Sequence, residues 1–462
     1  MKIAVSAFHR SVAVIILGIL LATLDGTILN LALPGIARDL HASAAESVWV
    51  VNAYQLAILI LLLPGAALGE LIGYKRVYLG GVAIFALASF ICFMATSLPM
   101  LTIARAFQGL GAAGIMAVNG ALVRLVFPDH LFGRAIAVNG AVVAVGSVAG
   151  PSLAAVVLSV APWPWLFVVN IPLGILILLL GWNALPRNAV APAAGARLSM
   201  PDIFMNTLMF GFVFLGVNAL HTRPGGTPAA GMLALALGLV GAGAVVGFFY
   251  LRRQLLLPAP LFPVDLLRIP VFALSICTSV ASFSAQTLAY IALPFLLLDG
   301  WGHSTAESGL ILTAWPLAIV VAAPLTGRLI GRYPSGLLGG VGLATVAIGL
   351  GLLVALPAHP PTFDVAWRMA LCGAGFGIFQ SPNNHTILRS APAHRSGAAS
   401  GMLGTARLTG QNIGAVLLAI IFSQSEAHST DGPLFALGLA SCFAAAGSLF
   451  SLLRLRHGAQ RI

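Results

Sequence analysis

Charged residues are scarce in this chain of 462 residues. They make up 8% of the sequence, against about 25% in soluble domains, while hydrophobic residues make up 59% and the mean hydropathy is +1.01. This balance excludes a soluble globular fold and predicts a polytopic membrane protein. Cysteines are also few. Cys92, Cys277, Cys372 and Cys442 lie in apolar runs without ligand-like spacing, so we expect neither a disulfide framework nor a metal site.

Acidic residues are rarer still, with 12 Asp and Glu against 23 Lys and Arg. The net charge of +11 does not indicate nucleic-acid binding, because the basic residues are scattered between apolar runs and form no basic face or stripe. The sequence shows no clustered metal pattern, nucleophile motif or phosphate loop. A membrane-embedded enzyme or receptor is therefore disfavoured, and we expect no catalytic residues and no cofactor.

Apolar runs of about 20 residues span a bilayer of roughly 30 Å. Fourteen such runs are present, near residues 11–33, 48–69, 77–97, 100–126, 135–159, 164–183, 203–220, 230–250, 271–298, 306–330, 335–356, 364–388, 397–423 and 433–453. We predict an all-α protein with a first six-helix bundle over residues 1–184, linkers and two additional helices over 185–270, and a second bundle over 271–462.

The basic residues set the orientation of these helices. With a cytoplasmic N-terminus, 18 of the 23 Lys and Arg lie inside, whereas Arg38, Arg223 and Arg368 lie outside. The positive-inside rule demands such an asymmetry. Both termini are therefore predicted to be cytoplasmic, in a multi-pass protein of the cell (inner) membrane.

The two six-helix sets also resemble each other. Gly150 and Gly414 are separated by 264 residues, as are Asn119 and Asn383, together with three further pairs of glycines. This spacing indicates a duplication. Transporters are commonly built from such repeats, with the substrate site between the halves.

One carboxylate, Asp25, lies inside the first apolar run. A carboxylate at membrane depth costs about 3 kcal/mol, so it is expected to face protein or water and to mark a proton or ion pathway. Arg105 of the fourth run lies at a similar depth, about 8 Å from the outer end of its helix against about 12 Å for Asp25. The two charges can meet. An adjacent arginine favours the ionised carboxylate and burial favours the protonated one, so such a group can exchange protons.

Purely structural roles for Asp25 and Arg105 also remain open at this point. Asp25 could cap a broken helix, and the pair could be a static link between two helices.

Several segments resemble motifs of one transporter family. Residues 24–34, LDGTILNLALP, resemble LDxTIVNVALP of the drug:proton antiporter branch with fourteen helices in the major facilitator superfamily. Residues 105–114, RAFQGLGAAG, are similar to RxxQGxGaa, and residues 146–155, GSVAGPSLAA, to GxxxGPxxGG. Residues 163–174, WPWLFVVNIPLG, and 400–407, SGMLGTAR, are similar to WRWiFliNvPiG and SGLLNTxR. The resemblance implies the major facilitator fold, with two extra central helices.

A weaker match covers residues 66–76, AALGELIGYKR, against GxLaDrxGrk, with Glu70 where Asp is usual. A tight basic loop that only anchors the topology is the alternative there, and close helix packing is the alternative for the small residues of 146–155. The residues carried over as gating or antiporter positions are Glu70, Gly73, Lys75, Arg76, Gly146, Gly150, Pro151 and Arg407.

Polar, aromatic and Met residues on the helices that resemble the family's cavity helices are expected to line a substrate cavity, although each could instead form an interhelical hydrogen bond or pack. They are Asn52, Tyr54, Gln55, Gln108, Met116, Asn139, Gln286, Tyr290, Phe376 and Gln380. His385 is expected to be water-exposed near a helix end.

The resemblance implies a monomeric proton-coupled antiporter that exports hydrophobic or amphiphilic drugs, dyes, biocides or quaternary ammonium cations by alternating access. Asp25 and Arg105 would couple the proton to the substrate. A dedicated exporter of a metabolite or antibiotic, or a proton symporter, is the alternative on the same fold. Because Arg105 and Arg407 also lie in apolar runs, neutral or anionic substrates remain open.

Overall fold

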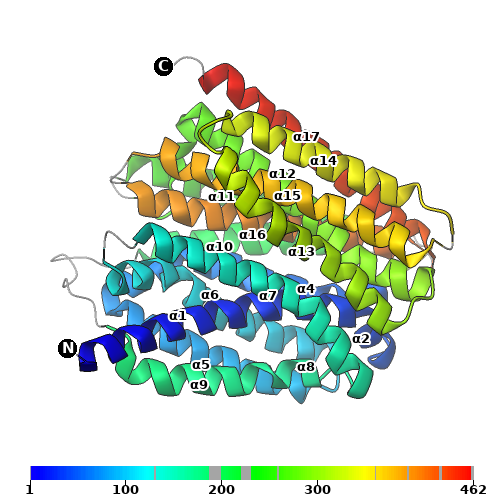
Figure 1. Cartoon of the computed structure of the whole chain (residues 1–462), viewed down its shortest axis with the longest axis horizontal. Helices are drawn as coiled ribbons and strands as arrows, with labels where there is room; N and C mark the ends of the chain where they lie inside the picture. The colour runs from blue at the N-terminus through cyan, green and yellow to red at the C-terminus, as the bar shows by residue number, and fades with distance from the viewer. Residues whose placement is uncertain are drawn as a thin grey trace.

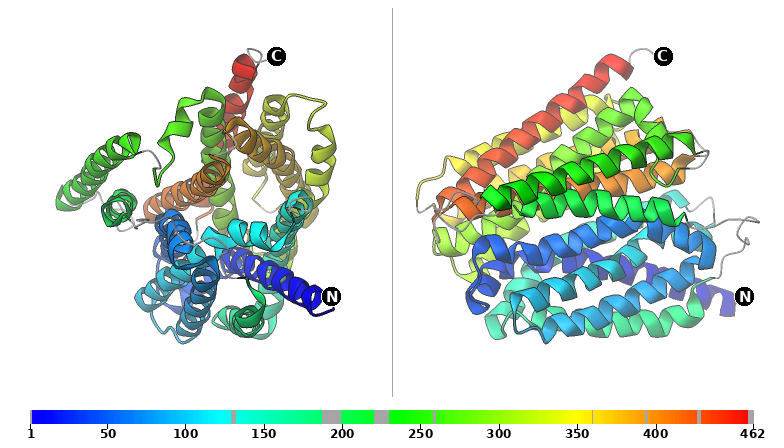
Figure 2. Two further views of the ribbon diagram at one scale, coloured as in Figure 1. Left: turned by 90° about the vertical axis from the view of Figure 1, so that its left-hand side faces the viewer. Right: turned by 180° about the vertical axis from the view of Figure 1, so that it is seen from behind.

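The computed structural model describes residues 2–128, 132–186, 199–219, 230–257, 260–358, 360–392, 395–425 and 429–458. Over these residues the protein is all-helical, and its only β-type pairing is an isolated bridge between Ile330 and Tyr333. The long helices run side by side, and both chain ends lie at the same end of the bundle (Figures 1 and 2). We call this end the terminus side and the opposite end the far side.

Each predicted apolar run coincides with a helix. The first six are α1 (Lys2–Ile28), α4 (Trp49–Ile72), α5 (Tyr74–Phe93), α6 (Leu98–Val126), α7 (Phe132–Val160) and α9 (Asn170–Ala184). The last six are α12 (Pro270–Phe295), α13 (Thr305–Leu329), α14 (Ser335–Val354), α15 (Thr362–Ser390), α16 (Ser396–Gln424) and α17 (Asp431–Gly458). Between them lie α10 (Met200–Asn218) and α11 (Ala230–Leu256), a pair that stands beside the main bundle (Figure 2).

Short elements complete the chain. They are η1 (Asn30–Ala32), α2 (Leu33–Asp39), α3 (Ala44–Ser47), α8 (Trp165–Val168), η3 (Val264–Arg268) and η4 (Leu296–Gly300).

Twelve helices are long and apolar enough to cross a membrane, counted over the described residues. The other two of the fourteen predicted spans are α7 and α15. In α7 the continuously described apolar part, Ala149–Val160, is shorter than a span. Helix α15 carries polar residues such as Asp364, Arg368 and Gln380 along its length. The multi-pass helical architecture is thus confirmed, whereas the count of fourteen stays a prediction.

Helices pack mainly within each half of the chain. In the first half α6 packs against α4 and α5, and α1 against α7 and α9; in the second half α15 packs against α13 and α14, and α12 against α16 and α17. The halves meet where α4 contacts α16 and where α7 contacts α13. Residues far apart in sequence therefore face each other along these two seams.

The far side holds the apolar core that joins the halves. Leu33 and Val50 from the first half belong to one buried cluster with Leu296 and Leu312 from the second. Toward the terminus side, the buried clusters belong chiefly to one half each. The halves are thus bound by more apolar contact on the far side, beside the end of α1 that carries Asp25.

Two of the few acidic residues have capping roles. Glu46 forms a capping box with Ser43 at the start of α3, and Glu307 forms one with Ser304 at the start of α13. These carboxylates satisfy backbone N–H groups that a helix start leaves free. They are therefore accounted for by helix geometry, unlike Asp25.

Candidate functional site

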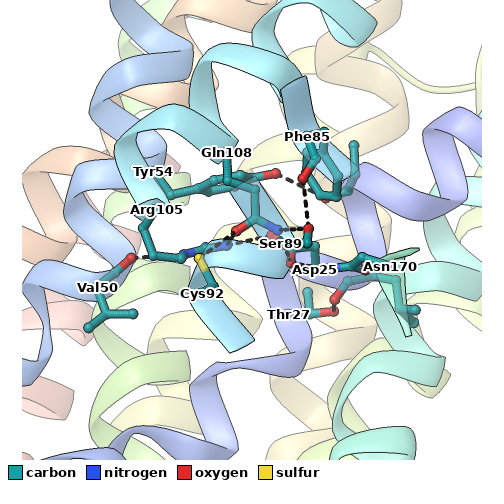
Figure 3. Close-up of polar contacts among 12 residues, drawn as sticks. Asp25, Thr27, Val50, Tyr54, Phe85, Ser89, Cys92, Arg105, Gln108 and Asn170 are labelled. Atoms are coloured by element: carbon teal, nitrogen blue, oxygen red, sulfur yellow. Dashed lines mark hydrogen bonds and ion pairs between the residues drawn. The ribbon is translucent and has the colours of Figure 1, made fainter. Parts of the chain in front are cut away.

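Asp25 lies near the far-side end of α1 and is fully buried, with 0% of its surface exposed. Arg105, near the start of α6, is 1% exposed and donates from Nη1 to Asp25 Oδ2 at 2.6 Å (Figure 3). The ion pair expected from the similar depth of the two residues is therefore present. It joins α1 to α6 inside the first half.

The second carboxylate oxygen is also engaged. Asp25 Oδ1 accepts from Gln108 Nε2 at 2.9 Å and from Asn170 Nδ2 at 2.7 Å (Figure 3). The carboxylate thus accepts three hydrogen bonds, from α6 and α9. An ionised carboxylate is an acceptor only, so these three donors match the charged form of Asp25.

Arg105 is held from several sides. Its Nε donates to the carbonyl of Val50 at 3.1 Å, Nη1 also donates to Gln108 Oε1, and the guanidinium carbon lies 4.0 Å from the centre of the Tyr54 ring (Figure 3). Arginine stacks well on aromatic faces because its planar charge is weakly hydrated. The guanidinium of Arg105 therefore binds groups of α4 on one side while it pairs with Asp25 on the other.

The network extends through neutral groups to α5. Gln108 Nε2 also donates to Ser89 Oγ at 2.8 Å, and Ser89 donates to the carbonyl of Phe85. Burying an ion pair is unfavourable unless hydrogen bonds satisfy its remaining atoms, as they do here. The site can therefore hold a charge pair out of water.

Asn170 and Ser89 are site residues that the sequence interpretation did not select. Asn170 lies inside the motif segment WPWLFVVNIPLG, and it is the one amide before Asn183 in the apolar run 164–183. That isolated amide was a usable signal. Ser89 gave none, since a serine in an apolar helix commonly bonds to its own backbone.

The residues expected to line a cavity fall into different surroundings. Tyr54 and Gln108 are buried in the charge network, and Asn52 is buried with both amide atoms lacking a hydrogen-bond partner. Phe376 is buried against Phe283, with ring centroids 5.5 Å apart. The partly exposed ones are Gln55, Met116, Gln286, Tyr290 and Gln380. The side chain of Asn139 lies outside the described residues, and His385 is exposed as expected.

The loop between α4 and α5 is a tight turn. Gly73 has φ +105°, a conformation that side chains disfavour, and Lys75 Nζ donates to the carbonyl of Trp182 at 2.5 Å. Arg76 donates back to the carbonyl of Ile72. Glu70 is exposed and forms no ion pair with any described residue. The loop is therefore tied to α9 of its own half.

Close packing of α7 on α1 follows the small residues of 146–155. A Cβ added at Gly146 would lie 3.1 Å from Thr23 Cβ, and one added at Gly150 would collide with Thr27 Oγ1. Pro151 lies inside α7, and its carbonyl oxygen faces Gly309 of α13. These glycines thus bring α7 against the helix that carries Asp25, as small residues at this spacing permit.

Comparison with known proteins extends over nearly the whole chain. Residues 15–415 match the Major Facilitator Superfamily. The chain is 51% identical over 437 residues to the "Uncharacterized transporter YebQ" of Escherichia coli, covering 95% of this chain and 94% of that protein. It is 31% identical to the "Riboflavin transporter RibZ" of Clostridioides difficile, covering 90% of this chain and 88% of the other. It is 30% identical to the "Multidrug resistance protein Stp" of Mycobacterium tuberculosis, covering 88% and 74%.

Solved structures share the fold at low sequence identity. The POT family transporter PepTSo superposes with a TM-score of 0.72 at 13% identity, covering 98% of this chain and 99% of that one. An auto-inhibited POT family peptide transporter gives a TM-score of 0.69 at 17% identity and covers 97% of each chain. At such identities the likeness concerns the fold alone.

Proposed function

Because the chain belongs to the Major Facilitator Superfamily and is thus a multi-pass membrane transporter of small molecules and not an enzyme, we propose that it exports hydrophobic or amphiphilic compounds in exchange for protons. In this proposal it works as a monomer in the cell (inner) membrane, with fourteen spans and both termini in the cytoplasm. Relatives that include a named multidrug resistance protein support export. The substrate cavity lies between residues 1–184 and 271–462, and α10 and α11 stand outside it.

The observation that carries proton coupling is the Asp25 network. Asp25 is the one acidic residue that is both buried in the interior of a described apolar helix and paired with a buried arginine. An ionisable group at membrane depth is by default a functional one. Its three hydrogen bonds stabilise the charged carboxylate and would weaken if the carboxylate took up a proton.

We infer the coupling from this change of bonds. A proton that reaches Asp25 cancels its charge, weakens the pair with Arg105 and frees hydrogen-bonding groups on α6 and α9. Release of the proton restores the pair. If substrate binds better to one of these two arrangements, proton and substrate weaken each other's binding by the same factor, which is the condition for antiport.

A dedicated transporter is the second candidate, because one relative is named a riboflavin transporter. It would use the same fold and the same proton site with a narrower cavity. A survival assay across chemically unrelated toxic compounds separates the two: protection against several favours multidrug export, and protection against one or none favours the dedicated role.

The decisive experiment is transport by purified protein in liposomes with an imposed pH gradient. We expect Asp25→Asn to lower gradient-driven dye movement at least tenfold, measured with ethidium and with 8-anilinonaphthalene-1-sulfonate. Asp202→Asn is the matched control, because Asp202 is equally buried and pairs with Arg253 at 2.7 Å outside the site. Intact gradient-driven transport by Asp25→Asn would show that the proton does not act through this carboxylate.

A further inference from the structure

Arg407 of α16 is a partly buried cation without a counter-ion among the described residues. Its Nε is buried and has no hydrogen-bond partner, and within the described part of the chain no ion pair engages its guanidinium. The two arginines that are fully buried in the described structure differ from it. Arg105 binds Asp25 and Gln108, and Arg454 binds the oxygens of Ser275 and Asn383.

The glycines of α16 show which way Arg407 faces. A Cβ added at Gly404 would lie 3.0 Å from Leu62 of α4, so this face of α16 meets the first half. Gly410 and Gly414 instead face α12 of the second half. At 3.6 residues per turn, Arg407 lies about 60° from Gly404 and about 60° from Gly410. It therefore points into the wedge between α4 and α12, that is, between the two halves.

The other side of α16 is filled by apolar contacts. Leu408 and Val416 belong to the buried cluster that includes Leu59 of α4 and Phe214 of α10. Arg407 interacts electrostatically with Tyr54, a member of the same cluster, whose ring is covered by Arg105. Arg407 thus faces the charge network of the first half across the seam.

The opposing helix presents further unpaired polar groups. Gln55 Oε1 is buried without a hydrogen-bond partner, and one turn away neither amide atom of Asn52 has one. Because α4 and α16 are antiparallel and Leu62 faces Gly404, Gln55 and Arg407 lie only about 6 Å apart along the helix axes. Arg407 of the second half and the neutral amide of Gln55 of the first half therefore lie beside the same wedge between α4 and α12.

The charges available in this wedge favour an anion. The buried Nε of Arg407 lacks a partner, and an anion that accepts hydrogen bonds would satisfy both this donor and the charge of the guanidinium. Asp25 does not serve this purpose, because Arg105, Gln108 and Asn170 already occupy its oxygens. A cationic substrate would need a free carboxylate, and the other buried carboxylate of the described spans, Asp202, is already paired with Arg253.

We propose that Arg407 binds an acidic group of the transported compound, with Gln55 contacting a neighbouring polar atom. The substrates are then amphiphilic acids, in which a carboxylate, phosphate or sulfonate is attached to a hydrophobic body. The guanidinium fork matches such oxyanions with two parallel hydrogen bonds. This assignment rests on the proposed export function, since it names the class of compound that the transporter carries.

The test is equilibrium binding to purified protein in detergent, without any gradient. The probes are 1-pyrenebutyrate and 11-(dansylamino)undecanoate, each beside its neutral methyl ester. We expect the native protein to bind at least one acid more tightly than its ester. Arg407→Gln should weaken binding of that acid about tenfold to a hundredfold, as for a hydrogen bond to a charged group, and leave the ester within about threefold.

Three further variants make the result specific. Arg407→Lys keeps the charge without the fork and should fall between the native protein and Arg407→Gln. Gln55→Leu should weaken the acid by up to about tenfold. Arg332→Gln, which removes an exposed arginine beyond the end of α13, should change neither probe. Monodisperse elution on gel filtration shows that each variant is folded.

Several results would overturn the assignment. These are an equal affinity of the native protein for acid and ester in both pairs, an equal loss of acid and ester in Arg407→Gln, or the same loss in Arg332→Gln. Added phosphatidylglycerol distinguishes a lipid headgroup from a soluble acid. If it displaces both acids only from proteins that keep Arg407, the site takes lipid and the substrate assignment fails.

Failure of this inference is distinguishable from failure of the proposed function. If acids bind through Arg407 but a pH gradient does not drive their transport, the binding site stands and proton exchange does not. If the gradient drives ethidium and no acid is preferred, proton exchange stands and the anion site does not.

Discussion

Removal of Arg105 provides a quantitative test of the buried pair. Arg105→Met leaves the carboxylate of Asp25 fully buried with only the amides of Gln108 and Asn170 as donors. Breaking a buried pair by removing one partner costs about 3–5 kcal/mol, because the remaining charge is uncompensated. We therefore expect Arg105→Met to lower the free energy of unfolding by about this amount.

The double variant Asp25→Asn, Arg105→Met should recover much of that loss. It removes the uncompensated charge and retains an amide that can accept from Asn170, so we expect it to be about 2 kcal/mol more stable than Arg105→Met alone. Asp25→Asn alone should cost less than Arg105→Met, because Arg105 keeps the carbonyl of Val50 and the ring of Tyr54.

The measurement is denaturant-induced unfolding of the four proteins in one detergent. A second cycle on Asp202 and Arg253 provides the comparison. That pair has the same close contact, 2.7 Å, but the Arg253 side chain is 44% exposed, so its coupling should stay below about 1 kcal/mol. If the Asp25 and Arg105 effects simply add, within about 0.5 kcal/mol, the two residues do not act as a buried pair.

Two further outcomes are expected. Asn170→Leu keeps the side-chain volume but removes a donor to Asp25, so gradient-driven transport should fall about tenfold or more. The control Asn183→Ala, at the exposed end of α9, should leave transport unchanged. Equal transport by the two variants would show that Asn170 does not belong to the site. Gly150→Ala drives a Cβ into Thr27 and should abolish transport. The double variant that also carries Thr27→Ala should recover transport in part. The control Gly120→Ala, where the added atom meets nothing within 4 Å, should lose none. Transport rates in liposomes check both, and an active Gly150→Ala protein would show that α7 need not touch α1 so closely.

The helices could be predicted from sequence because the signal is local. A bilayer demands about 20 consecutive apolar residues, and each of the fourteen runs coincides with a helix. The break after Ile28 could not be predicted in this way. The apolar run continues to Leu33, yet the chain turns through η1 into α2, because Pro34 can begin a helix but cannot continue the hydrogen bonding of α1.

The candidate site was predictable only in part. Asp25 and Arg105 could be paired from sequence, since rise per residue gives the depth of each in its own helix. Asn170 lies 145 residues from Asp25, and nothing local shows which face of α9 meets α1. The unpaired state of Arg407 is likewise a property of packing, because it depends on how Gly404, Gly410 and Gly414 set the rotation of α16 between α4 and α12.

The two halves carry polar networks on corresponding helices, and only one network has a carboxylate. In the first half Asp25, Arg105 and Asn170 link the first, fourth and sixth helices near the far side. In the second half Arg454 of the sixth helix binds Ser275 of the first and Asn383 of the fourth, near the terminus side. Its partners in the described structure are neutral oxygens, which cannot take up a proton at ordinary pH. One network therefore contains an ionisable carboxylate at membrane depth and the other only neutral partners of its arginine, so the proposed proton coupling acts through the first half.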